Sequence, residues 1–249
     1  MTDYRLVDWP GWIRLLSAYV KYWPSDGMGD MTGGVEQSPR LATRAQDAVR
    51  ILFLLWKAGT QPGADAPPDA VRVIGSQMRL QALDFWLRNP DYVAYELALE
   101  VEAGKRDPGD LQTVERILSD DEPDLRRFPM IRYLFGAFEP LDDALALLRM
   151  AGLISIRRIP GGRGGVWRHD YYLLSSGQKC AERLVSEAPE LNWYAERATL
   201  VASLARDAGG AELKSRQYEQ LEYAQTELGS RITSIGSRVR DKLAALRQL

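Results

Sequence analysis

Apolar residues recur every three or four positions along most of the chain, which is the spacing that places them on one face of an α-helix. The pattern predicts helices over residues 12–22, 41–58, 78–87, 92–102, 110–118 and 140–151. The second helix ends in the run 51–56, and a helix end that is apolar on all sides is typical of a core. Asn89 and Pro90 stop the third helix, because proline disfavours a helical backbone at the residue before it.

The stretch that follows residue 140 carries the most specific pattern. Gly152 suits the left-handed conformation that ends a helix. Residues 153–159 then alternate as a strand does, the sequence PGGRGG forms a glycine-rich tip, and residues 166–174 read as a second strand. A further helix starts at residues 175–177, where Ser175 or Ser176 is suited to cap it. A helix, a strand, a tip, a strand and a helix form the second half of a winged helix.

The chain divides into three predicted parts. Residues 1–40 hold an N-terminal helix and a flexible linker, since residues 24–40 are rich in glycine and proline and have almost no large apolar side chain. Residues 41–205 form the winged-helix core, with turns at 59–69 and 103–110. We therefore predict a mainly α-helical protein with a small β-hairpin: a winged helix-turn-helix core with extra N-terminal helices and a long C-terminal helix.

The third part, residues 206–249, has a heptad pattern. Apolar residues alternate at spacings of three and four over about four heptads, which indicates a coiled-coil seam. The seam consists of Tyr218, Leu221, Leu228, Ile232, Ile235, Val239 and Leu246. Gln225 and Lys242 interrupt it, and Gly229 and Gly236 each lower helix propensity by about 1 kcal/mol. We expect this helix to need a partner, such as a second copy of the chain in a homodimer through residues 218–246, and deletion after Gly210 to affect assembly rather than core folding.

Composition narrows the functional classes. The chain has 249 residues, 32 basic and 34 acidic side chains and a net charge of −2, so nucleic-acid binding would have to rest on local charge. Cys180 is the only cysteine and His169 the only histidine, which rules out a disulfide framework and multi-cysteine or two-histidine metal sites. The longest apolar run has six residues, far fewer than the roughly 20 of a membrane span, and the first ten residues lack a secretory signal. We expect a cytoplasmic protein without membrane contact.

Local positive charge gathers around the predicted wing. Residues 144–169 contain no acid, and the basic side chains there are Arg149, Arg157, Arg158, Arg163 and Arg168. Trp167, at the wing, is suited to anchor an interface. Arginines on a wing can neutralise phosphates of a DNA backbone, which makes binding steeply salt-dependent. These six residues are the candidate nucleic-acid-binding or partner-binding site.

The helix before the wing argues against reading of DNA bases. Its start carries Glu139, Asp142 and Asp143 where such a helix would approach base edges. Acids in a first turn also complement the helix dipole by about 0.3–1 kcal/mol, which is the simpler explanation of their presence. We therefore favour backbone contact by the wing, or docking of the wing on a protein.

An enzymatic interpretation finds little support in the residue types. His169 lies in the second wing strand, where a surface position is expected, and Cys180 suits a buried apolar role. The acids at 120–122 precede a proline and suit a solvated turn better than a metal site, and the glycine-rich tip lacks the GK[ST] of a phosphate loop. We expect no catalytic activity, no cofactor and no metal. Most aromatic residues, such as Trp56, Trp86 and Tyr133, are expected in the core.

Several short sequence motifs resemble those of a bacterial winged-helix group in which long loops separate the helices ahead of the wing. They are RLQALDFWLRNPDY (79–92), YLFGA (133–137), LALLRMAGLI (145–154) and YLLSSG (172–177), with an Arg-led apolar helix at 50–56 and a helical tail at 193–204. Within that group the layout over residues 40–205 is most similar to the middle components of ABC-three-component systems, the family that includes the small subunit of Lamassu-type anti-phage defence.

The resemblance implies a non-catalytic subunit that bridges an SMC-like or ABC ATPase and an effector subunit in sensing foreign double-stranded DNA. The alternative is a dimeric winged-helix transcriptional regulator, with residues 218–246 as its dimer helix. A regulator would purify alone and bind a defined operator, with single base changes costing about 1–3 kcal/mol. A bridging subunit would bind DNA weakly or without sequence preference and copurify with neighbours from its operon.

Overall fold

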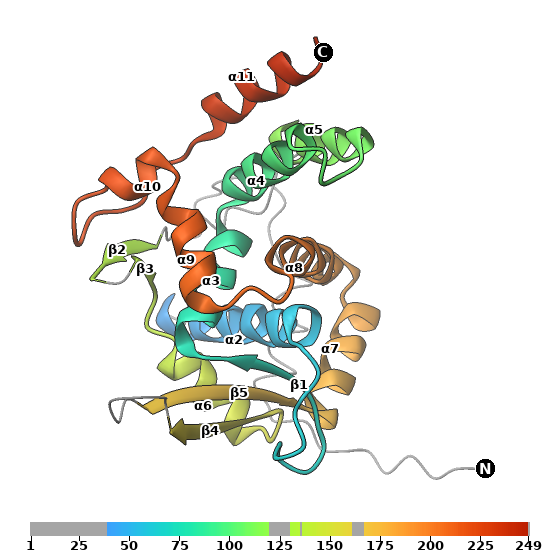
Figure 1. Ribbon diagram of the computed structural model, residues 1–249. Helices are drawn as coiled ribbons and strands as arrows, with labels where there is room; N and C mark the ends of the chain where they lie inside the picture. Colours follow the sequence, from blue (N-terminus) through green and yellow to red (C-terminus); the bar gives the residue numbers. More distant parts are fainter. Residues whose placement is uncertain (1–38, 120–129, 135, 161–166, 249) are drawn as a thin grey trace, which may run out of the picture.

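The computed structural model describes residues 39–119, 130–134, 136–160 and 167–248 (Figure 1). The predicted helix at 12–22, most of the linker at 24–40, the acids at 120–122 and the tip residue Arg163 lie outside these ranges. The described chain is mainly helical, with a small antiparallel sheet.

Between residues 39 and 150 the helices begin and end close to where the hydrophobic pattern places them, and further helices follow up to residue 246. They are α2 (Pro39–Ala58), α3 (Gln77–Arg88), α4 (Pro90–Glu102), α5 (Leu111–Ser119), α6 (Asp142–Met150), α7 (Ser175–Glu187), α8 (Asn192–Ala205), α9 (Gly210–Tyr218), α10 (Leu221–Gln225) and α11 (Gly236–Leu246). Two short 3-10 turns, η1 (Pro108–Asp110) and η3 (Pro189–Leu191), precede α5 and α8. Pro90 separates α3 from α4, as predicted.

The main sheet has three antiparallel strands in the order β1 (Ala70–Gly75), β5 (Trp167–Leu174), β4 (Ile154–Pro160). Strands β4 and β5 are the predicted hairpin, whereas β1 was not anticipated. The β1 strand lies at a sheet edge, and of its six residues only Ile74 is fully buried, so its sequence shows little alternation. A second sheet joins β2 (Ile131–Tyr133) to β3 (Gly136–Phe138), and the backbone N–H of Arg132 donates to Ser230 O at 2.9 Å beside it.

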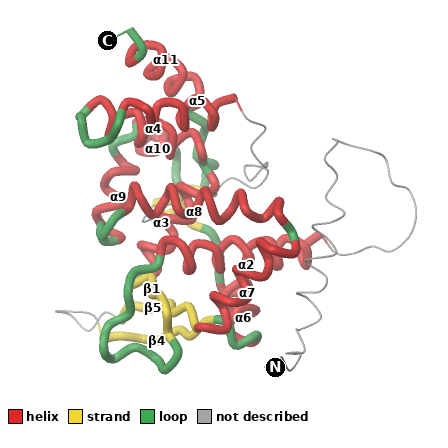
Figure 2. The backbone as a smooth tube through the Cα atoms, turned by 90° about the vertical axis from the view of Figure 1, so that its right-hand side faces the viewer, coloured by secondary structure: helices red, strands yellow, loops and turns green. Residues whose placement is uncertain are grey.

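The elements are arranged in layers in both views (Figures 1 and 2). The main sheet lies at one end with α6 and α7, helices α2, α3 and α8 cross the middle, and α4, α5 and α11 lie at the far end. One face of the sheet, carrying Ile74, Ile154 and Leu173, belongs to the same hydrophobic core as these helices. Helices α4 and α5, which lie between α3 and α6 in the sequence, therefore belong to the far end, whereas α6 lies beside the sheet.

Helix α3 is the centre of the core, because its ten residues from 79 to 88 are all buried. Its polar side chains are satisfied by several other elements. The Arg79 guanidinium donates to the carbonyl oxygens of Arg206, at 2.8 Å, and Ala208. The side chain of Gln81 donates to Glu139 O at 2.7 Å and accepts from Glu139 N at 3.0 Å. Each buried polar group thus fixes the position of a neighbouring segment.

A chain of buried ion pairs runs through the same helix. Asp84, fully buried on α3, accepts from Arg50 Nε of α2 at 2.6 Å and lies 3.8 Å from Arg88 Nη1. Arg88 Nη1 is in turn 2.9 Å from the carboxylate of Glu139, just ahead of α6. Burial by itself lowers the pKa of Arg50, but Asp84 and Asp47 outweigh it and raise that pKa above its usual value. The ion pairs tie α2, α3 and the start of α6 together.

The C-terminal part is not the long helix that the heptads predict. Residues 210–246 form three short helices, and Gly229, at φ +81°, adopts a left-handed conformation between the last two. The seam residues Ile232, Ile235 and Val239 are buried within the chain's own core, while Leu221 and Leu228 stay exposed. The predicted continuous seam is therefore wrong: its two glycines lie outside a continuous helix or at a helix start, and most of its apolar residues already have a neighbour.

Polar contacts hold the C-terminal part against the far-end helices. Arg216 of α9 places Nη2 2.6 Å from the carboxylate of Glu96 on α4, and burial raises the pKa of Glu96 although Arg216 opposes that shift. Asp91 accepts from the backbone N–H of Ile235 and from Ser234 Oγ, both at 2.7 Å. The boundary predicted at residue 205 therefore separates segments that share one core.

Within the described ranges, none of the helices has the length and hydropathy needed to cross a bilayer.

Removal of the C-terminal part tests this packing. A chain ending at Gly210 would lose Ile232, Ile235, Val239 and Leu243 from the core, each worth about 1.5–3 kcal/mol of burial. The summed burial free energy of these four side chains is comparable to the whole free energy of unfolding of a typical domain. We therefore expect the thermal unfolding transition to disappear, or its midpoint temperature to fall by more than about 10 °C. A chain ending at Arg247 is the control and should unfold like the full-length chain. An unchanged transition in the shorter chain would contradict the packing.

Candidate functional site

The hairpin of β4 and β5 grows directly out of helix α6. Gly152 ends the helix at φ +66°, as predicted, and the backbone N–H of Leu153 donates to Leu148 O at 3.0 Å. The strands then pair from Ile154 opposite Leu173 to Pro160 opposite Trp167 without a bulge. The register is therefore defined along the hairpin up to residue 160, beyond which the tip lies outside the described residues.

Opposite residues of an antiparallel pair point to the same side, so the register assigns each arginine to a face. Arg158 lies opposite His169, on the side that continues through Ile156 and Tyr171 into the core. Arg157 and Arg168 lie on the other side, opposite Asp170 and Ile159 respectively. The hairpin arginines do not line one common face.

The side that bears Arg158 carries an exposed aromatic contact. The guanidinium carbon of Arg158 lies 4.4 Å from the centre of the Trp167 ring. Trp167 remains 49% exposed, and Arg158 is exposed as well. A cation stacked on an indole holds both side chains in place, and tryptophan and arginine are residue types enriched among the residues that dominate binding at protein interfaces.

The two arginines on the other side are engaged within the chain. Arg168 places Nε 3.0 Å from Asp170 Oδ1 and donates from Nη2 to Oδ2 at 3.1 Å. Asp170 is buried and also accepts from the backbone N–H of Ser76 at 3.3 Å. Arg157 Nη1 donates to Asp65 O at 2.5 Å. These contacts tie the hairpin to the β1 strand and to the loop before it.

The exposed surface of α6 is mixed in charge. Asp142 and Asp143 are exposed in its first turn, and Asp143 Oδ2 lies 2.8 Å from Arg44 Nε. Arg149 and Met150 are exposed in the last turn, and Met150 reaches 86% exposure. The third acid, Glu139, is partly buried on Arg88 instead of facing solvent. The N-cap is Leu141, whose side chain offers no cap, so the acids of the first turn complement the helix dipole directly.

Of the six residues assigned from the sequence, the structure brings only Arg158 and Trp167 into contact. Arg149 lies at the opposite end of β4, before the strand begins. Arg157 and Arg168 share a face but have partners inside the chain, and Arg163 is not among the described residues. The partner role of Asp170 was missed, although alternate positions of a strand, such as 168 and 170, lie on one face. Met150 was missed because its neighbours in the helix are apolar and buried.

The other chemically distinctive residues lie in ordinary environments. His169 is exposed and Cys180 is buried, as the sequence predicted. Burial raises the pKa of the Cys180 thiol to about 12. In the part of the chain that the structure describes, no three His, Cys, Asp or Glu side chains gather as a metal site would need. Leu174, not Ser175 or Ser176, is the N-cap of α7, and Ser176 Oγ donates to Gly152 O at 2.6 Å.

The aromatic side chains are distributed less simply than predicted. Trp86 is buried in α3, and Trp56 is partly buried. Tyr133 is 49% exposed and was wrongly placed in the core. It lies on the β2–β3 hairpin beside the ring of Phe138, with 5.6 Å between ring centres. The backbone of this hairpin forms a two-stranded sheet at the surface, so one side of β2 has no layer above it.

Comparisons with known proteins add no relative: no protein-family model matches the chain, and neither curated proteins nor solved structures gave a match.

The environment of Cys180 makes a direct prediction. Because burial raises the pKa of the thiol to about 12, the thiol is protonated at pH 8, whereas the thiolate is the reactive form. We expect the native chain to resist 5,5′-dithiobis(2-nitrobenzoic acid) at pH 8 and one thiol to react once denaturant unfolds it. Stoichiometric reaction of the native chain within minutes would show that the thiol is accessible and ionised, contrary to its burial.

Proposed function

We propose that this chain is a non-catalytic winged-helix subunit that bridges partner proteins, with the surface of α6 and the β4–β5 hairpin as its protein contact. The observation that carries the proposal is the exposed stack of Arg158 on Trp167. The stack places a tryptophan and an arginine side by side on the surface, and these are two of the residue types that are enriched among the residues dominating interface energies. Met150 extends the exposed apolar surface to the start of the hairpin.

The winged-helix assignment rests on connectivity. Helix α2, strand β1, helices α3 and α6, and strands β4 and β5 follow in the order of a winged helix, with the first and last strands adjacent in the sheet. The insertion between α3 and α6 holds α4, α5 and the β2–β3 hairpin. This arrangement agrees with the sequence resemblance to winged-helix middle components, in which long segments separate the helices ahead of the wing.

The charge of α6 favours a protein partner over base reading. The helix that would enter a major groove begins with Asp142 and Asp143, and a polyanion would repel both. Arg157 and Arg168 each donate to oxygen atoms of the chain itself, so phosphate contacts by them would compete with those bonds. Contact with the backbone of double-stranded DNA remains a secondary and sequence-independent part of the proposal.

By its resemblance, the proposed setting is an anti-phage or anti-plasmid complex in which the chain joins an SMC-like or ABC ATPase to an effector subunit. The exposed position of His169 and the protonated, buried thiol of Cys180 support a role without chemistry of its own. The alternative, a dimeric transcriptional regulator, relied on residues 218–246 as a dimer helix. Burial of Ile232, Ile235 and Val239 inside the chain leaves that alternative without its dimer seam.

Copurification tests the proposed contact. The tagged chain, expressed from its own operon, should recover an SMC-like ATPase that mass spectrometry identifies. The double variant Trp167→Ala, Arg158→Ala should lower that recovery at least tenfold, because loss of a central aromatic–arginine pair typically costs about 2 kcal/mol or more. Both side chains are exposed, so the thermal unfolding temperature should stay within a few degrees of the wild-type value.

Tyr133→Ala is the matched control, because Tyr133 is an aromatic residue of equal exposure on the other hairpin. It should recover the ATPase as the wild type does. Equal recovery by the double variant would refute the assigned contact. If the wild-type chain recovers no ATPase and binds one defined duplex in preference to unrelated duplexes at two salt concentrations, the bridging role itself is wrong.

A further inference from the structure

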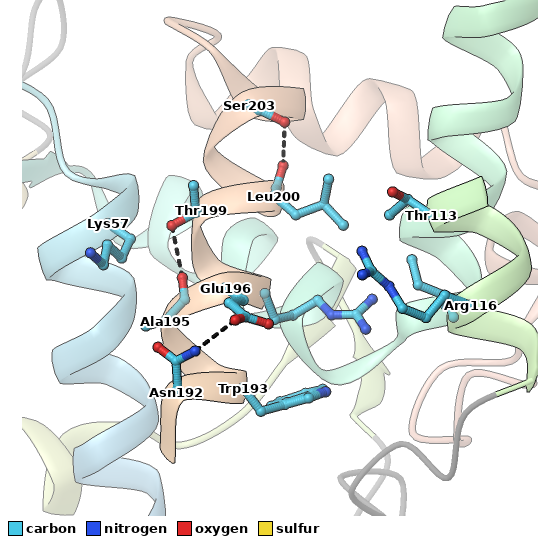
Figure 3. Close-up of a pocket in the computed structure, with 12 residues that line it drawn as sticks. Lys57, Thr113, Arg116, Asn192, Trp193, Ala195, Glu196, Thr199, Leu200 and Ser203 are labelled. Carbon is cyan, nitrogen blue, oxygen red and sulfur yellow. Dashed lines mark hydrogen bonds between the residues drawn. The ribbon is translucent and has the colours of Figure 1, made fainter. Parts of the chain in front are cut away.

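A cavity of about 510 Å³ lies beside α8, away from the β4–β5 hairpin (Figure 3). Helix α8 forms its wall, the end of α2 closes one side, and α5 closes the other. Its size falls in the range of roughly 300–1,000 Å³ that is typical of sites for small ligands. None of the residues that line it belongs to the surface of the proposed function.

The charge of the lining residues is positive. Lys57, Arg116 and Arg197 contribute three cations, and Glu196 is the one carboxylate among the twelve lining residues. Glu196 Oε1 already accepts from Asn192 Nδ2 at 2.6 Å. The cavity therefore has an excess of donors that suits an anion.

Two guanidinium groups define the anion-binding end. Arg116 reaches from α5 toward α8 in Figure 3, and it makes no hydrogen bond or ion pair through its side chain with any other described residue. Arg197 is 6% exposed in the wall, with its guanidinium carbon 5.2 Å from the centre of the Trp193 ring. Each guanidinium has five N–H donors in a planar fork that matches the oxygen atoms of a phosphate. Both guanidinium groups line the same cavity, so donors from each can contact one phosphate.

The remaining wall is apolar rather than hydrogen-bonding. Trp193, Ile117 and Leu200 line it, and two of the lining hydroxyls donate within α8. Thr199 Oγ1 donates to Ala195 O at 2.8 Å and Ser203 Oγ to Leu200 O at 2.7 Å. A flat ring can pack against the apolar side chains of Trp193 and Leu200.

We propose that this cavity binds a nucleoside phosphate, with its phosphate on Arg116 and Arg197 and its ring against the apolar wall. Lys57, whose Nζ lies 3.5 Å from the centre of the Trp56 ring, adds positive charge at the α2 side. The site is independent of the hairpin surface, so its absence would leave the bridging role untouched.

Titration calorimetry of the full chain with adenosine 5′-monophosphate, adenosine and inorganic phosphate tests the proposal. We expect one saturable site for the monophosphate and at least tenfold weaker binding of adenosine and of phosphate alone. Arg116→Ala should weaken binding of the monophosphate at least tenfold, because hydrogen bonds between charged groups are stronger than those between neutral groups. Arg240→Ala is the control, since Arg240 is also an exposed arginine on a surface helix, and it should bind as the wild type does.

Three outcomes would overturn the proposal. One is no saturable binding of the monophosphate by the wild-type chain, and another is unchanged binding by Arg116→Ala. The third is Arg116-dependent binding of an acidic peptide, such as hexaglutamate, more tightly than the monophosphate, which would assign the cavity to a segment of a partner protein. Arg116 is exposed on α5, so its replacement should leave the unfolding temperature nearly unchanged.

Discussion

The buried carboxylate of Asp84 is the interaction on which the arrangement of this protein depends. A charge withdrawn completely from water is tolerated only with partners close by, and removing one partner of a buried pair typically costs about 3–5 kcal/mol. Asp84 has Arg50 of α2 at 2.6 Å and Arg88 of its own helix at 3.8 Å, and Arg88 continues to Glu139. These ion pairs fix the relative positions of α2, α3 and the segment around Glu139 that leads into α6. Helix α6 then fixes where the β4–β5 hairpin starts.

Helix α3 also holds the C-terminal segments in place. Because α3 is buried on all sides, its remaining polar groups also need partners, and they find them in the segment around residues 206–208 and in α9. Gln217 Nε2 donates to Ala82 O at 2.9 Å, so the C-terminal helices are anchored on the centre of the core. Helices α4, α5 and α11 thus lie on the opposite side of the middle helices from the main sheet. The β4–β5 hairpin, which carries the stack of Arg158 on Trp167, therefore packs on a core that buried ion pairs and hydrogen bonds hold in one arrangement.

Local features of this fold are legible in the sequence, because they depend on residues close together in the chain. Helix periodicity, the break at Pro90, the left-handed Gly152 and the two strands of the hairpin all follow from neighbours within a few positions. Tertiary context decided what the sequence concealed. Strand β1 is an edge strand with one fully buried residue, so its pattern was too weak to recognise. The heptads after Tyr218 suggested a second chain, yet the apolar side chains meet α4 and α5 of the same chain.

The candidate site shows the same division. The concentration of arginines and the exposure of Trp167 could be predicted, but not which arginine would be engaged. Asp170 accepts a hydrogen bond from Arg168, and the backbone carbonyl of Asp65 accepts one from Arg157. The second contact joins residues that are 92 positions apart in the sequence. The cavity beside α8 could not be predicted from the sequence, because Arg116 and Arg197 lie on α5 and α8, and the β4–β5 hairpin lies between these helices in the sequence.

Hydroxyl-radical footprinting of the chain alone and within the proposed complex with its ATPase tests the partner contact most directly, because Met150, Trp167 and Tyr133 are all exposed and readily oxidised. If α6 and the β4–β5 hairpin form the partner contact, oxidation of Met150 and Trp167 falls several-fold on assembly while that of Tyr133 is unchanged. Protection of Tyr133 with undiminished oxidation of Trp167 would place the partner on the β2–β3 hairpin and contradict the account.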